Sequence, residues 1–195
     1  MDPDLVEEID YLNDVLTKSG FFGKDEILEI LEDQFIEENV DFSQFKISSH
    51  DSDNANFNKL EDVFTSLTLK GIVSIHNCGY DIEEGVEDTF ELFTHLLNNK
   101  FKPVGFCFYT FEDIEDAIFE NKLNITFGDF ENNENKALEI GKIVYDSLKE
   151  SFDVRWDMTV NNQIEIVNFK WDKSYDESKE YEIEGAYENF VNNRG

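Results

Sequence analysis

The chain has 195 residues, 40% of them hydrophobic, so it is long enough to bury one sizeable core and too apolar to be disordered. Its 16 lysines and arginines against 45 acidic residues give a formal charge of −29, which disfavours nucleic acid and anionic membranes as partners. A basic protein is the expected partner if there is one. An acidic or salt-adapted proteome explains the charge without any partner.

The cysteines and the N-terminal segment predict a cytoplasmic protein. Cys78 and Cys107 allow one disulfide at most, and Cys107 lies in an apolar run that predicts a buried strand, so we expect two reduced thiols. Residues 1–4 lack the basic and apolar regions of a signal peptide. No segment is long and apolar enough to span a bilayer.

Hydrophobic residues at helical spacing predict three helices in the first 70 residues. The first runs from Leu5 and ends before Gly20, the second covers residues 24–39, and the third covers residues 57–67. A polar loop at residues 43–56 separates the second helix from the third.

From Gly71 onward, short β-like runs alternate with amphipathic helices. Strands are expected at residues 72–75, 104–109, 123–127, 154–156 and 163–167. Helices are expected at residues 86–97, 111–121, 134–151 and 183–191. In the helix at residues 86–97, Phe90, Phe93 and Leu97 are expected to face inward. The last two strands are close enough in sequence to form an antiparallel hairpin.

These elements predict an α+β fold with α/β-like alternation. Strands separated by helices favour parallel pairing and the hairpin adds antiparallel pairing, so the sheet is expected to be mixed, with about five strands. An N-terminal helical layer is expected to pack on it. The predicted regions are 1–70, helical; 71–172, the mixed core; and 173–195, a charged extension, all in one folded unit.

Several short blocks follow one another in a specific order between residues 76 and 171. They are Asn77-Cys78-Gly79; Gly105-Phe106-Cys107-Phe108 with Asp113 and Glu115 after it; Leu123 to Gly128; Ile140-Gly141; Val154-Arg155-Trp156; and Ile164-Glu165-Ile166 leading to Trp171. In these blocks the chain resembles an uncharacterised bacterial family, a domain of unknown function. The resemblance covers about half of the chain and implies no assigned chemistry. The family pattern has further cysteines and a histidine where this chain has Ser74, Ile75 and Thr110.

Two segments contain residue types that bind metals. His76 and Cys78, followed by acidic residues at 81 and 83, combine soft and hard ligands, but a zinc site usually needs four ligands in fixed geometry. A strand-end turn that uses the backbone freedom of Gly79 is the preferred interpretation. Residues 51–62 partly imitate a calcium loop, but Ala55 and Asn56 stand where a ligand oxygen and a turn glycine are expected, so a solvated loop is predicted.

Acidic residues also crowd the start of the helix predicted at 111–121. The helix dipole and free backbone N–H groups favour acidic side chains there, so capping is the preferred interpretation. Asp113 and Glu115 match the family blocks and remain site candidates. Trp171 is followed directly by charged residues and is a candidate for an interface.

No nucleophile elbow, phosphate-binding glycine loop, HExxH or CxxC motif is present in the sequence. We therefore favour a non-enzymatic interaction module, for example of immunity or inhibitor type, whose acidic surface binds a basic protein such as a nuclease toxin. The alternative is a metal-binding protein or metal-assisted enzyme that uses carboxylates near Asp113 or the His76/Cys78 pair. A third possibility is an acidic domain within a larger assembly. No cofactor is predicted, and the oligomeric state stays open.

Overall fold

The computed structural model describes residues 2–38, 40–42, 45–48 and 50–194, which group into two compact units. Unit 1 comprises Met1–Asn54 and Asp172–Ser178, and unit 2 comprises Ala55–Trp171 and Lys179–Gly195. These boundaries differ from those predicted at residues 70 and 172, because the third helix groups with the sheet and the expected C-terminal extension is divided between the units. No helix in the described part of the chain is long and apolar enough to cross a membrane.

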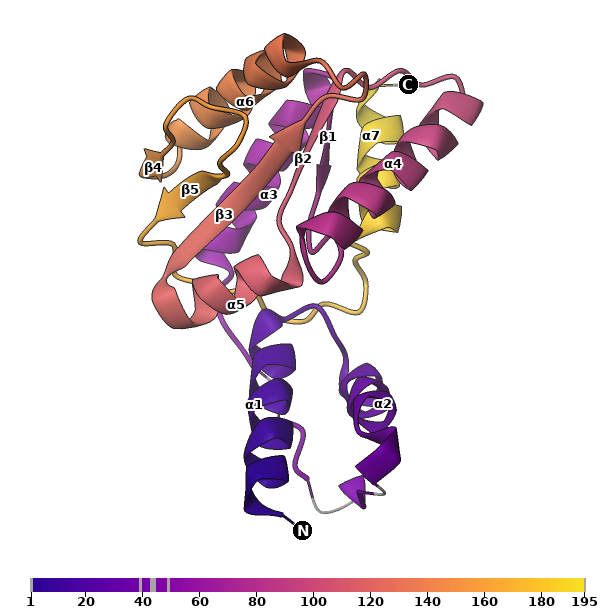
Figure 1. Ribbon diagram of the computed structural model, residues 1–195, viewed down its shortest axis with the longest axis vertical. Helices are drawn as coiled ribbons and strands as arrows, with labels where there is room; N and C mark the ends of the chain where they lie inside the picture. The colour runs from indigo at the N-terminus through magenta and orange to yellow at the C-terminus, as the bar shows by residue number, and fades with distance from the viewer. Residues whose placement is uncertain (1, 39, 43–44, 49, 195) are drawn as a thin grey trace. The chain divides into compact units, whose positions relative to one another are not determined.

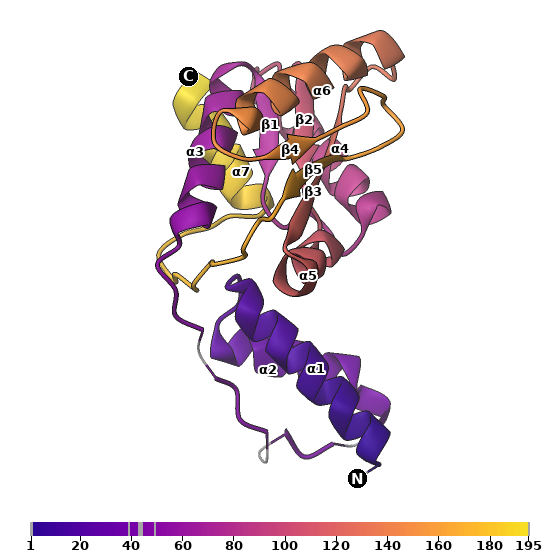
Figure 2. The ribbon, with the colours of Figure 1, turned by 90° about the vertical axis from the view of Figure 1, so that its left-hand side faces the viewer.

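Unit 1 contains the helices α1 (Pro3–Ser19) and α2 (Lys24–Gln34) and the short 3-10 helix η1 (Ile36–Glu38), and Figure 2 shows α1 and α2 side by side. The left-handed backbone of Gly20, with φ of 71°, ends α1 as predicted. The second helix ends five residues before the expected end at Asn39, which lies outside the described residues. The polar loop predicted at residues 43–56 includes positions 43, 44 and 49, which also lie outside them.

The segment at residues 172–178 is held in unit 1 by Lys173, which is almost fully buried. Its ammonium donates hydrogen bonds to the Gly20 carbonyl at 2.5 Å and the Ser174 carbonyl at 3.3 Å, and lies 4.5 Å from the centre of the Phe21 ring. Next to it, the Ser174 amide donates to the Asn54 side chain at 2.6 Å. These bonds satisfy polar groups that would otherwise be costly to bury.

Unit 2 is a five-stranded mixed sheet with helices on both faces, as Figure 1 shows, and it confirms the predicted α+β fold. The strand order is β1-β2-β3-β5-β4; β1 and β2 pair in parallel, and the other neighbours pair antiparallel, including the predicted hairpin of β4 and β5. In chain order the elements are α3 (Ala55–Leu69), β1 (Ile72–Ile75), α4 (Ile82–Asn98), β2 (Gly105–Phe108), α5 (Phe111–Glu120), β3 (Lys122–Gly128), α6 (Glu134–Lys149), β4 (Val154–Arg155), β5 (Ile164–Val167) and α7 (Ile183–Arg194).

Strands β2 and β3 are separated by a helix and still pair antiparallel, contrary to the parallel pairing that such a connection suggests. The short helix α5 starts at the carboxyl end of β2 and ends at Asn121, whose left-handed backbone, with φ of 56°, leads directly into β3. The strand β3 therefore starts at the end of the sheet where β2 stopped, and runs in the opposite direction.

The two faces of the sheet are covered by different helices. On one face, Val73, Ile75, Phe106 and Phe108 form a core cluster with side chains of α4 and α7. On the other face, α3 packs against β1, and α6 packs against β2 and β3. The alternation of side chains along a strand produces this two-sided burial. Helix α7 belongs to the core, although its sequence suggested only a short helix in a charged extension.

The buried side of α4 differs from the predicted one. Thr89, Leu92 and Leu96 face the core, whereas Phe90 and Leu97 are 39% and 43% exposed. Phe93 is partly buried and stacks on Phe130 at 4.0 Å between ring centres. The prediction was wrong because α4 carries apolar residues on two sides. The buried stripe also includes a glycine and a threonine, which a count of large apolar residues does not include.

Candidate functional site

The parallel pairing of β1 and β2 brings their carboxyl ends to the same edge of the sheet, where α4 and α5 both begin. The segments that follow the two strands are tied together by backbone hydrogen bonds from Cys78 to Tyr109 (2.9 Å), from Phe111 to Gly79 (3.1 Å) and from Glu112 to Tyr80 (3.1 Å). The carboxyl edge of a sheet is where open α/β folds bind their ligands. Most of the sequence-predicted site residues lie here.

His76 belongs to an aromatic cluster inside unit 2. Its Nδ1 atom lies 2.8 Å from the Tyr109 hydroxyl, and its ring stacks on Phe64 of α3 at 4.5 Å between centres. Phe57 of α3 contacts the same ring from 5.2 Å. The imidazole is buried by these rings, so its contacts are those of a core residue.

Cys78 points toward a different element from His76. Its Sγ lies 3.3 Å from the Gly85 carbonyl and 3.7 Å from the Thr89 hydroxyl of α4, and burial raises the pKa of the thiol to about 12. The other thiol, Cys107, is also free and buried, so the prediction of two reduced cysteines is confirmed. A thiol with so high a pKa stays protonated at neutral pH and is a poor nucleophile or metal ligand.

The structure does not bring His76 and Cys78 together as ligands. The prediction of a strand-end turn at Gly79 is confirmed by its φ of 70°, where an added Cβ would meet the Gly85 nitrogen at 2.6 Å. In the calcium-like segment, α3 begins at Ala55 and Asp62 lies within the helix. Among the described residues, no group of three or more His, Cys, Asp or Glu side chains is placed to hold a metal ion. The metal alternative stays a prediction without a located site.

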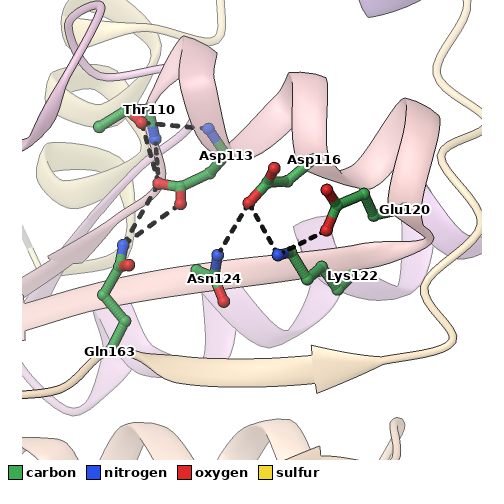
Figure 3. Close-up of polar contacts among 7 residues, drawn as sticks. All are labelled: Thr110, Asp113, Asp116, Glu120, Lys122, Asn124 and Gln163. Carbon is green, nitrogen blue, oxygen red and sulfur yellow. Dashed lines mark hydrogen bonds and ion pairs between the residues drawn. The ribbon is translucent and has the colours of Figure 1, made fainter.

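Thr110 is the N-cap of helix α5 and Asp113 completes its capping box, and Figure 3 shows the hydrogen bonds between them. The Asp113 carboxylate accepts from the Thr110 amide and hydroxyl, both at 2.9 Å, while its own amide donates to the Thr110 hydroxyl at 3.2 Å. The amide of Gln163 donates to it at 3.3 Å and also reaches the Thr126 hydroxyl at 3.0 Å. Burial raises the Asp113 pKa even though these hydrogen bonds act to lower it. The capping interpretation is therefore confirmed.

Asp116, one turn further along α5, contacts a lysine. The Lys122 ammonium lies 3.3 Å from the Asp116 carboxylate and 2.6 Å from the Glu120 carboxylate, and Asn124 donates to Asp116 at 3.4 Å. Figure 3 shows Lys122 between the two carboxylates. Of the four acidic residues at the start of α5, Asp113 and Asp116 thus have these local partners. Glu112 is exposed and Glu115 is partly exposed on the helix surface.

An exposed tyrosine lies among the carboxylates at this edge, and we call Tyr80, Asp81, Glu112 and Glu115 the Tyr80 surface. The Tyr80 side chain is 54% exposed and its ring stacks on Phe111 at 6.2 Å. Partial burial, followed by the charges of Glu115, Glu112 and Asp81, raises its pKa. Partial burial and the neighbouring carboxylates also raise the pKa of Glu112. Within residues 50–194, no lysine or arginine forms an ion pair with Asp81 or Glu112.

The sequence predicted only part of the Tyr80 surface. Glu115 was a candidate, but Tyr80 was not, although a tyrosine between Gly79 and the helix-capping Asp81 is a detectable signal. Trp171, the predicted interface residue, is only 7% exposed and packs edge-on against Phe57 and Tyr109 at 6.0 and 5.8 Å. It therefore lies among the core aromatic residues.

No curated protein and no solved structure matches the chain significantly. One family model does match, and it covers residues 2–175, a longer stretch than the blocks noted between residues 76 and 171. The matched region includes all of the candidate residues at the carboxyl edge and stops before α7. The chain thus belongs to the family described as a domain of unknown function, DUF6891.

Proposed function

We propose that the chain is a bacterial, cytoplasmic, non-enzymatic interaction module of immunity or inhibitor type, and that it binds a basic protein through the Tyr80 surface. The observation that carries the proposal is an exposed, stacked tyrosine whose pKa is raised by partial burial and by three neighbouring carboxylates. Tyrosine is enriched among the residues that dominate binding energy, and a complementary field speeds the encounter with an oppositely charged partner.

Helix capping accounts for only part of this negative charge. Asp81 caps α4 by accepting a hydrogen bond from the Glu84 amide at 3.0 Å, and Glu84 reaches back to the Tyr80 amide at 2.8 Å. Glu112 lies in the first turn of α5, where the dipole favours a carboxylate, but its raised pKa means that the net environment opposes its charge. A partner that supplies a lysine or arginine would remove this repulsion.

The groups that could have served catalysis each have a structural partner, which favours a binding role. The His76 ring bonds to Tyr109, the Cys78 thiol is buried against Gly85, and Asp113 caps α5. The net charge of −29 also argues against nucleic acid and anionic membranes as partners.

The test is affinity capture from the host of this protein. The tagged chain is immobilised at low salt and eluted with increasing salt, and the eluate is identified by mass spectrometry. We expect a basic protein in stoichiometric amount that leaves at moderate salt, because rim charges act through screened attraction. The variant Tyr80→Ala/Glu112→Gln/Glu115→Gln should lose this protein.

A matched control variant changes the same residue types elsewhere: Tyr11→Ala/Glu134→Gln/Glu139→Gln. All three control positions are exposed, so both variants have the same net charge and comparable surface changes. Capture by the control but not by the surface variant would support the proposal. An empty eluate from the wild-type chain, or binding that survives molar salt unchanged, would contradict it.

A further inference from the structure

Helices α4 and α7 pack side by side over the β1–β2 half of the sheet, as Figure 1 shows, and a groove lies between them. The groove encloses about 280 Å³. Pockets that hold whole small molecules are roughly 300–1,000 Å³, so this one is suited to a single side chain. Its lining consists of Glu91, Leu92 and His95 from α4 and Ile183, Glu184, Tyr187 and Glu188 from α7.

Both walls of the groove are packed on the core of unit 2, because Leu92 and Leu96 of α4 belong to the same core cluster as residues of α7. At one end of α7, the side-chain amide of Asn77 donates to Glu182 at 2.5 Å, just after β1. At the other end, the Arg194 guanidinium donates to the Leu69 carbonyl at 2.9 Å. Ala186 and Phe190 of α7 are buried in the core cluster between these two anchors. The groove therefore has its shape before any ligand arrives, which reduces the cost of binding.

The lining combines apolar and negatively charged groups. Leu92 is buried, Ile183 and Tyr187 are partly buried, and the Tyr187 ring lies 4.7 Å from the His95 ring between centres. Glu91 on α4 faces Glu184 and Glu188 on α7 across the groove, and all three glutamates are exposed. Among residues 50–194, no lysine or arginine forms an ion pair with any of these three.

The negative charge continues along α4 beyond the groove. Partial burial, followed by the charges of Glu84, Glu91 and Glu87, raises the pKa of Asp88, one turn before Glu91 and Leu92. These carboxylates repel one another, and α4 supplies no cation among them. A positive group bound beside Glu91 would relieve that repulsion, which is a source of affinity in addition to direct contacts.

We propose that this groove is a binding site for an arginine side chain of the basic partner, an inference that rests on the proposed function and adds a second contact to it. The aliphatic part of arginine would lie on Leu92 and Ile183, and the planar guanidinium would face the three glutamates and the Tyr187 ring. Arginine fits this lining better than lysine, because its guanidinium is weakly hydrated, stacks on aromatic rings and pairs with carboxylates in a fork geometry.

The test uses N-acetyl-arginine-N-methylamide as the probe and the ¹⁵N-labelled full chain at low salt, followed by NMR. We expect saturable amide shifts confined to residues 88–95 and 183–188, with a dissociation constant on the order of millimolar. The citrulline analogue, which has the same shape without the charge, should produce no saturable shifts. Shifts spread over the whole acidic surface, or equal shifts with citrulline, would overturn the inference.

Variants separate the groove from general charge effects. Glu91→Gln/Glu184→Gln/Glu188→Gln keeps the shape of each side chain and should weaken probe binding by about tenfold. The control Glu134→Gln/Glu139→Gln/Glu150→Gln removes the same charge from exposed positions and should bind like the wild-type chain. Equal weakening in both variants would mean that only net charge matters, and the groove would not be a site.

The same variants in the affinity capture distinguish the two proposals. If the groove variant retains the basic protein that the Tyr80 surface variant loses, the groove inference fails and the proposed function stands. If no basic protein is captured but the arginine probe saturates the groove, the proposed function fails and the groove remains an arginine site. Loss of the captured protein in both variants, with retention by the control, supports both.

Discussion

Asp113 and Asp88 are two aspartates in unit 2 whose pKa values are raised, in both cases first by burial. Their neighbours are opposite in kind. Asp113 is surrounded by hydrogen-bond donors from Thr110 and Gln163, whereas Asp88 is surrounded by the charges of Glu84, Glu91 and Glu87. The Asp113 carboxylate is thus hydrogen-bonded within the fold, whereas the Asp88 carboxylate lies among negative charges, and α4 contains no lysine or arginine to neutralise them.

The difference shows that the direction of a pKa shift does not by itself identify a functional carboxylate. Donors around Asp113 connect α5 to β5 and make it a structural residue. Like charges around Asp88 repel one another in the isolated protein, and in the proposed complex a bound cation would relieve this repulsion. Removing the carboxylate should therefore lower the free energy of unfolding at Asp113 and raise it at Asp88, and both changes can be measured.

Asp113→Ala is expected to have the largest effect. It removes a capping interaction, worth about 1 kcal/mol, and leaves the buried amide and hydroxyl of Thr110 without their acceptor, at about 1–3 kcal/mol. We expect the free energy of unfolding in urea to fall by about 2–3 kcal/mol, with an unchanged m value. As a control, Glu91→Ala at an exposed position should change it by less than about 0.5 kcal/mol. Equal losses in the two variants would contradict the structural role of Asp113.

The raised carboxyl pKa values also determine whether the stability of the fold rises or falls with pH. Asp88, Glu112 and Asp113 have higher pKa values in the folded chain than their ordinary values of 3.8 for Asp and 4.5 for Glu, so the folded chain binds their protons more tightly. The free energy of unfolding should therefore rise as pH is lowered from neutral through the folded pKa values toward the ordinary ones. Melting temperatures measured from pH 7.5 to 4.5 at low salt should increase. A steady decrease over that interval would contradict the raised values.

Much of the fold could be predicted because its signals are local. The strands at 72–75 and 164–167 are short segments rich in isoleucine and valine, and α3 shows a regular apolar stripe. The closing hairpin followed from two strands close together in the chain. The antiparallel pairing of β2 with β3 was not predicted. It depends on the position of α5 relative to the strand ends and on the left-handed backbone of Asn121, and residue propensities indicate neither.

The candidate site was less predictable because it depends on contacts between segments distant in sequence. His76 and Cys78 are two residues apart, yet the His76 ring stacks on α3 and the Cys78 thiol lies against α4. The groove combines α4 with α7, and α7 has two buried side chains, Ala186 and Phe190, in a sequence with a weak apolar pattern. Lys173 lies in a segment whose charged residues predicted an exposed extension, but it is buried because the Gly20 carbonyl accepts a hydrogen bond from its ammonium. Sequence periodicity contains none of these pairings.

Asp88→Asn is expected to have a smaller effect than Asp113→Ala and the opposite sign. The substitution removes repulsion with Glu84 at i−4 and Glu91 at i+3, pairs that each cost a few tenths of a kcal/mol on a helix surface. We expect stabilisation by about 0.5 kcal/mol at low salt and less at 1 M salt, where such interactions are screened. Chemical denaturation at both salt concentrations measures this. Destabilisation at low salt would mean that Asp88 has a favourable partner.

Divalent metal ions are expected to have the smallest specific effect, and they distinguish a field of carboxylates from a coordinated site. The acidic surface should attract Mg²⁺ and Ca²⁺ diffusely, so the melting temperature should rise gradually with concentration, and Na⁺ should reproduce most of the rise at equal ionic strength. A coordinated ion would instead give a shift that saturates with its dissociation constant, and a stoichiometric metal content in protein purified without chelator. A saturating response to Zn²⁺ that disappears in Cys78→Ser would support the metal alternative at the His76/Cys78 pair. A saturating response to Mg²⁺ or Ca²⁺ that disappears in Glu115→Gln would support it near Asp113, because the carboxylates there would then be metal ligands.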